Sequence, residues 1–136
     1  MRLFAKNKKN ILTDVFVLAS AAYYISREDL SLLMVNMVNN NNIKDNAKFY
    51  IRVRSKKDFR YGYGKKIAPS RFEMPEDSVT GENCAKIEFY SENEIVSILK
   101  NKLNLKDYDV MISESQNEQN GVNIFNSDII IWGVIN

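Results

Sequence analysis

Residues 84–103 of the chain read CAKIEFYSENEIVSILKNKL, and this stretch carries the strongest local signals for the fold. Its first part alternates apolar and polar side chains, with Ile87 and Phe89 on one face, which predicts a half-buried β-strand over 84–90. Ser91 then opens the sequence Ser-Glu-Asn-Glu, a capping box, and apolar residues recur behind it at helical spacing. The stretch therefore predicts a strand followed directly by a helix.

Two more helices are predicted before this stretch. Apolar residues recur at helical spacing between residues 11 and 25, which predicts a helix buried on most of its sides. Ser26 is followed by an acid at the third helical position, Asp29, and therefore predicts the N-cap of a second helix of about 12 residues. This helix should end in the asparagine run 39–42, because asparagine favours turns. Together the two helices predict an N-terminal helical hairpin.

Alternation of apolar and polar side chains predicts the strands. Residues 47–55 read AKFYIRVRS, so one face is apolar and the other, which includes Arg52 and Arg54, is basic. Residues 129–132 read IIIW, and such a continuous apolar run is typical of a strand covered on both faces. The strand and ribbon segments predicted in this way are 47–55, 59–63, 84–90, 110–115 and, as one strand or two, 122–135, with a turn over 116–121.

These elements predict an α+β fold. The expected architecture is an N-terminal helical hairpin beside a four- to five-stranded mixed or antiparallel sheet, with one helix packed on a face of the sheet. A chain of 136 residues with 45% hydrophobic and 26% charged residues has the size and composition of one globular domain, which is expected over residues 1–136.

The chain has no histidine and one cysteine, and this composition restricts the possible chemistry. Without histidine there is no Ser-His-Asp or Cys-His catalysis and no His-ligated metal site. Gly64-Lys65 lacks the rest of a phosphate-binding loop, and the acids between residues 73 and 82 match no known metal loop. The expectation is a protein that is not an enzyme and that has no cofactor, no metal and no membrane partner.

Single residues are given structural roles at this stage. Cys84 is expected to be a small buried hydrophobe, and one cysteine cannot form an internal disulfide, which fits a reducing compartment. Trp132, Met34 and Met37 are expected to pack in the core. The apolar run from residue 15 to residue 25 has about half of the ~20 residues that cross a bilayer, so a cytoplasmic protein is expected.

Charge is distributed unevenly along the chain, although the net charge is only +2. Residues 1–72 contain 15 Lys and Arg against 5 Asp and Glu, which gives +10, and residues 73–136 contain 4 against 12, which gives −8. This asymmetry indicates one surface for a polyanion and one acidic surface for a basic partner. The alternative is that the two parts neutralise each other across the fold.

The basic charge is concentrated in residues 51–72, where eight cations face one acid and aromatic rings lie between them. Cations that contact phosphates and rings that stack on unpaired bases are the combination used to bind single-stranded nucleic acid. The alternative is an exposed hairpin whose rings cover the edge of the core and whose charges keep a sheet edge soluble. The candidate binding residues are Arg52, Arg54, Lys56, Lys57, Arg60, Tyr61, Tyr63, Lys65, Lys66 and Arg71.

The function expected from these patterns is a small non-enzymatic binding protein that engages nucleic acid or a nucleoprotein complex through this basic aromatic segment. The second expectation is an inhibitor from a phage or mobile element, for example of the anti-CRISPR type, that blocks a host protein complex through protein–protein contacts. It rests on the small size, on the 17 asparagines that indicate an AT-rich genome, and on the lack of catalytic residues.

Overall fold

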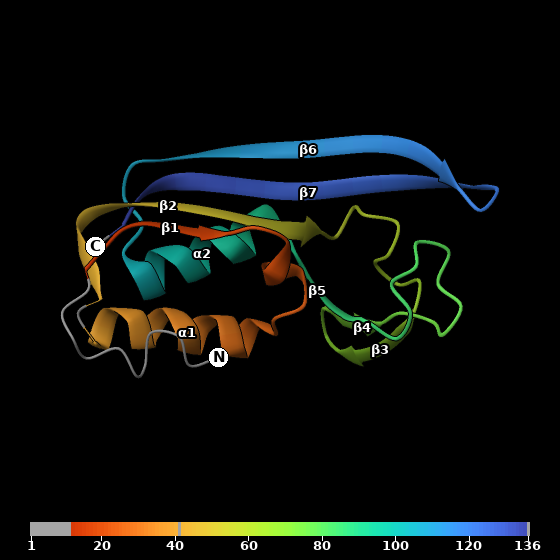
Figure 1. The fold of residues 1–136 in the computed structure, drawn as a ribbon, viewed down its shortest axis with the longest axis horizontal. Helices are drawn as coiled ribbons and strands as arrows, with labels where there is room; N and C mark the ends of the chain where they lie inside the picture. The colour runs from red at the N-terminus through yellow and green to blue at the C-terminus, as the bar shows by residue number, and fades with distance from the viewer. Residues whose placement is uncertain (1–11, 41, 136) are drawn as a thin grey trace.

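A computed structural model describes residues 12–40 and 42–135 as one curled mixed sheet with two α-helices on one side of it (Figure 1). In chain order the elements are β1 (Thr13–Leu18), the 3-10 helix η1 (Ser20–Tyr23), α1 (Arg27–Asn39), β2 (Ile43–Ser55), β3 (Lys65–Ala68), β4 (Arg71–Glu73), β5 (Lys86–Tyr90), α2 (Glu92–Leu103), β6 (Tyr108–Gln119) and β7 (Val122–Ile135).

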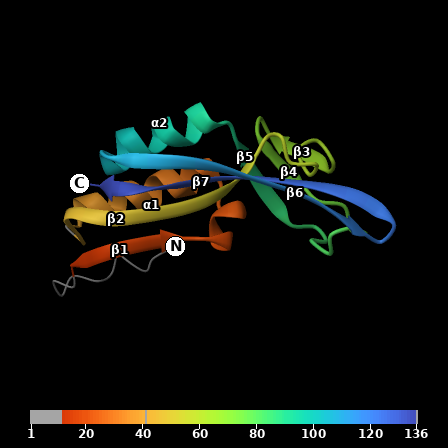
Figure 2. The same cartoon turned by 90° about the horizontal axis from the view of Figure 1, so that it is seen from above.

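The strand β2 lies in the middle of the sheet and pairs with three other strands. One of its edges pairs with β7 in the antiparallel direction, and β7 pairs on its other side with β6. The opposite edge of β2 is shared: β1 runs parallel to its first part, and β5 runs parallel to its end at Arg54 and Ser55. The strands β4 and β3 continue the sheet beyond β5, while the β6–β7 hairpin extends past the end of β2 (Figure 2).

The helix predicted over residues 11–25 is wrong in the part of that range that the structure describes. Residues 13–18 form β1, in which Phe16 and Leu18 are buried while Val15 and Val17 are each 57% exposed. This is a period of two, and β-branched and aromatic residues favour strands. The parallel pairing with β2 supplies backbone hydrogen bonds along one edge of the segment, so the expected helical hairpin is replaced by a strand, a 3-10 turn and one helix.

The other two predicted helices are confirmed. In α1, the Ser26 side chain accepts a hydrogen bond from the Asp29 backbone N–H at 3.1 Å, and in α2, Ser91 and Glu94 form the complete capping box. Both helices pack on the same face of the sheet (Figure 1), so the expectation of one helix on that face is wrong. No helix within residues 12–40 and 42–135 is long and apolar enough to cross a membrane.

The expected sheet of four to five strands is also wrong, because seven strands form the sheet in the described residues. Besides β1, the short strands β3 and β4 were not predicted, and residues 59–63, expected as a ribbon, form turns. The strand β6 continues through the expected turn to Gln119, since the reversal needs only Asn120 and Gly121, whose φ angles are 49° and 77°. Two residues with positive φ make a tight hairpin turn of the type that asparagine and glycine favour.

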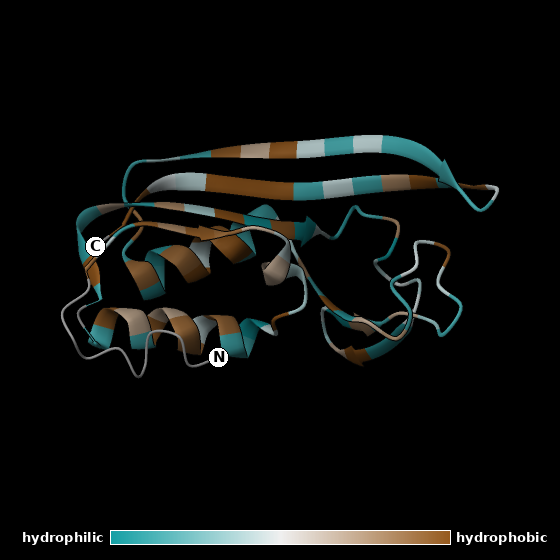
Figure 3. Ribbon diagram, in the orientation of Figure 1, coloured by the Kyte–Doolittle hydropathy of each residue, from teal (hydrophilic) through white to brown (hydrophobic). Residues whose placement is uncertain are grey.

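The core lies between the sheet and the helices. Met34 and Met37 are fully buried there, as predicted, and Phe16 stacks on Phe49 with ring centres 5.8 Å apart. A second, smaller apolar cluster lies on β4 and β5, around Phe72 and Phe89. Figure 3 shows the change along β6 from hydrophobic residues near the helices to hydrophilic residues toward the tip of the hairpin.

Two single-residue expectations are wrong. Cys84 is exposed and has a φ of 58°, because it lies in the turn before β5 rather than inside the strand. Trp132 is 38% exposed, because β7 turns this side chain away from the helices, while Ile131 beside it is fully buried against them.

Candidate binding surfaces

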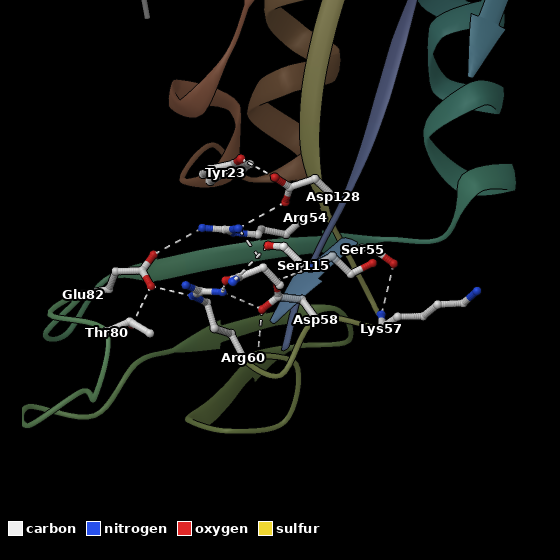
Figure 4. A network of polar contacts seen from close by, with 12 residues as sticks. Tyr23, Arg54, Ser55, Lys57, Asp58, Arg60, Thr80, Glu82, Ser115 and Asp128 are labelled. Carbon is white, nitrogen blue, oxygen red and sulfur yellow. Dashed lines mark hydrogen bonds and ion pairs between the residues drawn. The ribbon is translucent and has the colours of Figure 1, made fainter. Parts of the chain in front are cut away.

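Three of the eight cations of the predicted basic segment lie within a network of polar contacts where β2, β7 and the turn after β2 meet (Figure 4). We call this the charge network; it joins three arginines and three acids, Arg52, Arg54, Arg60, Asp58, Glu82 and Asp128. The side chains of Asp58 and Asp128 are almost completely buried, so their charges need close partners.

Arg54 is the centre of this network. Its side chain is only 12% exposed, and its Nη1 lies 3.1 Å from Oδ1 of Asp128 and 3.7 Å from Oδ2 of Asp58. The Oε2 atom of Glu82 lies 3.9 Å from Nη2 of Arg54. Arg52 reaches the second oxygen of Asp128 at 2.6 Å, so two arginines of β2 share one carboxylate of β7.

Arg60 connects the turn after β2 to the rest of the fold. Its side chain is 5% exposed, and it donates to Asp58 at 2.8 Å and also to Glu82. Asp58 in turn accepts a hydrogen bond from the backbone N–H of Ser127 on β7, at 2.8 Å. These contacts hold the turn against the β6–β7 hairpin.

Tyr23, in η1, also contacts the charge network. Its hydroxyl donates to Asp128 at 2.7 Å, and the guanidinium of Arg54 lies over its ring. Burial, followed by the hydrogen bond to the carboxylate, raises the pKa of Tyr23 to about 12. The tyrosine therefore stays neutral and remains a hydrogen-bond donor at physiological pH.

A second set of ion pairs surrounds the start of α2. Arg27 contacts Glu88 at 2.9 Å and Glu94 at 3.1 Å, Lys56 contacts Glu94 at 2.8 Å, and Arg71 contacts Glu88 at 3.5 Å. Burial alone would raise the pKa of Glu94, but hydrogen bonds from Lys56, the Ser91 backbone and Arg27 lower this pKa to about 2. The carboxylate therefore stays ionised well into the acid range.

These contacts pair the basic and the acidic parts of the chain with each other. The acids Glu82, Glu88, Glu94 and Asp128 all follow residue 72, and their cationic partners all precede it. Five of the candidate residues therefore fit the alternative interpretation, in which the basic and the acidic parts of the chain neutralise each other across the fold. These residues are Arg52, Arg54, Lys56, Arg60 and Arg71.

The remaining candidate residues are more accessible. Lys57, Lys65 and Lys66 are exposed and form no ion pair within the described part of the chain. Tyr61 is 36% exposed, although its ring also packs edge-on against Phe72 and Phe89. Tyr63 is half-buried, with its ring 5.3 Å from that of Phe59.

The face of the sheet opposite the helices carries an apolar surface that the sequence analysis missed. Val17, Tyr50 and Trp132 stand in direct register on β1, β2 and β7, so their side chains form one row across three neighbouring strands. Val15 lies beside this row on the same face and is as exposed as Val17. We call Val15, Val17, Tyr50 and Trp132 the outer patch.

A shallow cavity of about 380 Å³ lies in the outer patch and is lined mainly by apolar groups. Lys48 lines it between Val15 and Val134, and it forms no ion pair with any described residue. The signal in the sequence is the alternation of Val15 and Val17 with Phe16 and Leu18, but it is visible only when the segment is taken as a strand.

Within residues 12–40 and 42–135, no group of three or more His, Cys, Asp or Glu side chains is arranged to hold a metal ion. Among the acids between residues 73 and 82, Glu82 is bound to Arg60 and Thr80. A scan against models of known protein families gives no match for this chain, and a search of curated proteins gives none either.

Proposed function

We propose that this is a small non-enzymatic binding protein and that its partner is another protein, which docks on the outer patch. The observation that carries the proposal is the row of Val17, Tyr50 and Trp132 across three paired strands on the face opposite α1 and α2. Exposed apolar groups that form a contiguous surface are typical of protein contact sites, whereas single exposed apolar residues need no explanation.

The outer patch also has the composition of an interface centre. Tryptophan and tyrosine supply large apolar areas together with a polar group, and they dominate the binding energy of many protein interfaces. Lys48 is an exposed cation that lines the cavity of the outer patch, and it favours a carboxylate on the partner. The partner is therefore expected to present an apolar surface with an acid opposite Lys48.

The proposal can be tested by placing a photo-crosslinking residue at position 17 and irradiating the protein in a nuclease-treated cell lysate. The matched control carries the crosslinker at Leu32, which is 58% exposed on α1, against 57% for Val17. We expect a discrete protein adduct at position 17 only, and its loss when Trp132→Ser is added. Adducts of equal yield at both positions, or an adduct with a second copy of this chain, would contradict the proposal.

Nucleic acid is the second candidate partner, and it is supported by the exposed lysines Lys57, Lys65 and Lys66 and by the partly exposed ring of Tyr61 in the same segment of the chain. The expectation of an inhibitor of a host complex, from a phage or mobile element, is part of the main proposal. Such an inhibitor would act through a protein-contact face of the kind described here.

A further inference from the structure

The outer edge of β6 is a second surface with a distinct chemistry. In the order of the sheet β6 comes last, and within the described residues it pairs only with β7. Twelve residues, Tyr108–Gln119, therefore run along an edge whose outward backbone N–H and C=O groups are not used by another strand.

This edge is acidic and contains no cation. Residues 108–135, which form the whole β6–β7 hairpin, include no lysine or arginine. Asp109, Glu114 and Glu118 are exposed on β6 and make no ion pair with any described residue. The fourth acid of the hairpin, Asp128, is instead neutralised by Arg52 and Arg54 on β2.

The side chains of β6 also specify where apolar groups of a partner would lie. Met111 is 47% exposed on the face of the outer patch, and Ile112 is 42% exposed on the helix face. Ile112 and Ile129 line a cavity of about 340 Å³ next to the start of α2. A side chain from a strand added beside Ile112 would point to this cavity, because neighbouring strands hold their side chains in register.

We propose that the β6 edge binds an extended basic segment of another protein as an added antiparallel β-strand. Main-chain hydrogen bonds to the free edge supply affinity, and the side-chain pattern supplies specificity. Opposite Glu114 and Glu118 the partner has lysine or arginine, and opposite Met111 and Ile112 it has apolar residues. The site lies along the edge strand β6, whereas the outer patch lies on β1, β2 and β7, and the proposal does not depend on the patch.

A synthetic peptide with the sequence Lys-Thr-Thr-Thr-Lys-Thr-Val-Val matches this pattern, with its lysines opposite Glu118 and Glu114. Two control peptides separate the contribution of charge from that of the main-chain hydrogen bonds. The first has glutamate in place of both lysines. The second has N-methyl groups on alternate residues, which removes the hydrogen bonds between the strands. Binding is measured by fluorescence anisotropy at about 50 mM salt, where screening is weak.

We expect the lysine peptide to bind at least about tenfold more tightly than the glutamate peptide, and the N-methylated peptide not to bind. The double variant Glu114→Gln, Glu118→Gln should remove this preference, whereas Glu76→Gln, a change of an exposed loop acid, should not. Hydrogen exchange should slow in β6 when the lysine peptide is bound.

The inference would be overturned if the glutamate peptide or the N-methylated peptide bound with the same affinity as the lysine peptide. It would also be overturned if the lysine peptide did not bind at about 1 mM. Slower exchange in the outer patch instead of β6 would overturn it as well. None of these outcomes affects the crosslinking test at position 17, so the two proposals can fail separately.

Discussion

The guanidinium of Arg54 lies 4.0 Å from the centre of the Tyr23 ring, and both side chains bind the carboxylate of Asp128. The three residues come from β2, η1 and β7, so the contacts of Asp128 connect three elements that are distant in the sequence. Arg54 was expected to face a ligand, and in the structure its contacts are with this network.

Arg54→Gln should therefore lower the free energy of unfolding. The substitution leaves the buried carboxylates of Asp58 and Asp128 with less compensating charge, and loss of one partner of a buried ion pair costs about 3 kcal/mol or more. Urea denaturation measures the change. Lys57→Gln is the matched control, since Lys57 is exposed, and it should change stability by no more than about 0.5 kcal/mol. Equal effects of the two substitutions would contradict the role given to Arg54.

The ion pairs of Glu94 predict a loss of stability in acid. Its pKa is lowered from 4.5 to about 2 in the folded protein, so the unfolded chain takes up the proton first as the pH falls. The stabilisation by this group is complete above about pH 4.5 and is lost as the pH falls to about 2. Denaturation midpoints across this range should decline less in Glu94→Gln than in the wild type or in Glu92→Gln. The same decline in all three proteins would exclude the contribution of Glu94.

The capping box of α2 predicts a specific cost for Ser91→Ala. The Ser91 hydroxyl accepts from the Glu94 backbone N–H at 3.2 Å, and without it this donor has no partner in the first turn of α2. Thermal or urea unfolding should show a loss of about 1 kcal/mol. Ser97→Ala, on the exposed surface of the same helix, should be nearly neutral. If Ser91→Ala and Ser97→Ala changed the free energy of unfolding equally, the cap would not stabilise α2.

Direct binding of nucleic acid predicts a salt dependence set by the accessible lysines. With phosphate contacts from Lys57, Lys65 and Lys66 only, the logarithm of affinity for a single strand should fall with the logarithm of salt at a slope of about −2. Changing all three to glutamine should remove the slope together with the affinity, while Tyr61→Ala should weaken binding and leave the slope unchanged. A slope near −4 would require the ion-paired arginines to contact phosphates as well, and absence of binding at about 50 mM salt would exclude nucleic acid.

The elements that could be predicted from the sequence are those that local interactions determine. Ser26 and Ser91 mark the starts of α1 and α2 by hydrogen bonds within one turn, and the alternation in residues 47–55 gives the middle and end of β2. The segment 13–18 could not be assigned in this way, because Val15, Leu18 and Ala22 also fit a helical period. Its strand conformation depends on pairing with β2, about 30 residues later in the chain.

The candidate binding surfaces depend even more on long-range contacts. The concentration of cations in residues 51–72 was visible in the sequence, but their partners, such as Asp128, are up to 76 residues away. The outer patch requires three strands to meet in register, and the three isoleucines before Trp132 favour a core position for it when the sequence is taken alone. A local pattern carries no information about which face of β7 the helices cover.

The central position of β7 also affects how this protein can fold during its synthesis. β7 follows every other described element in the chain, yet it lies between β2 and β6 in the sheet. Until residues 122–135 have left the ribosome, the apolar face of β2 and the inner faces of α1 and α2 have no strand to complete their core. The core of the nascent chain therefore stays incomplete until this strand has been made, and the chain is most exposed to aggregation and to chaperones during that interval.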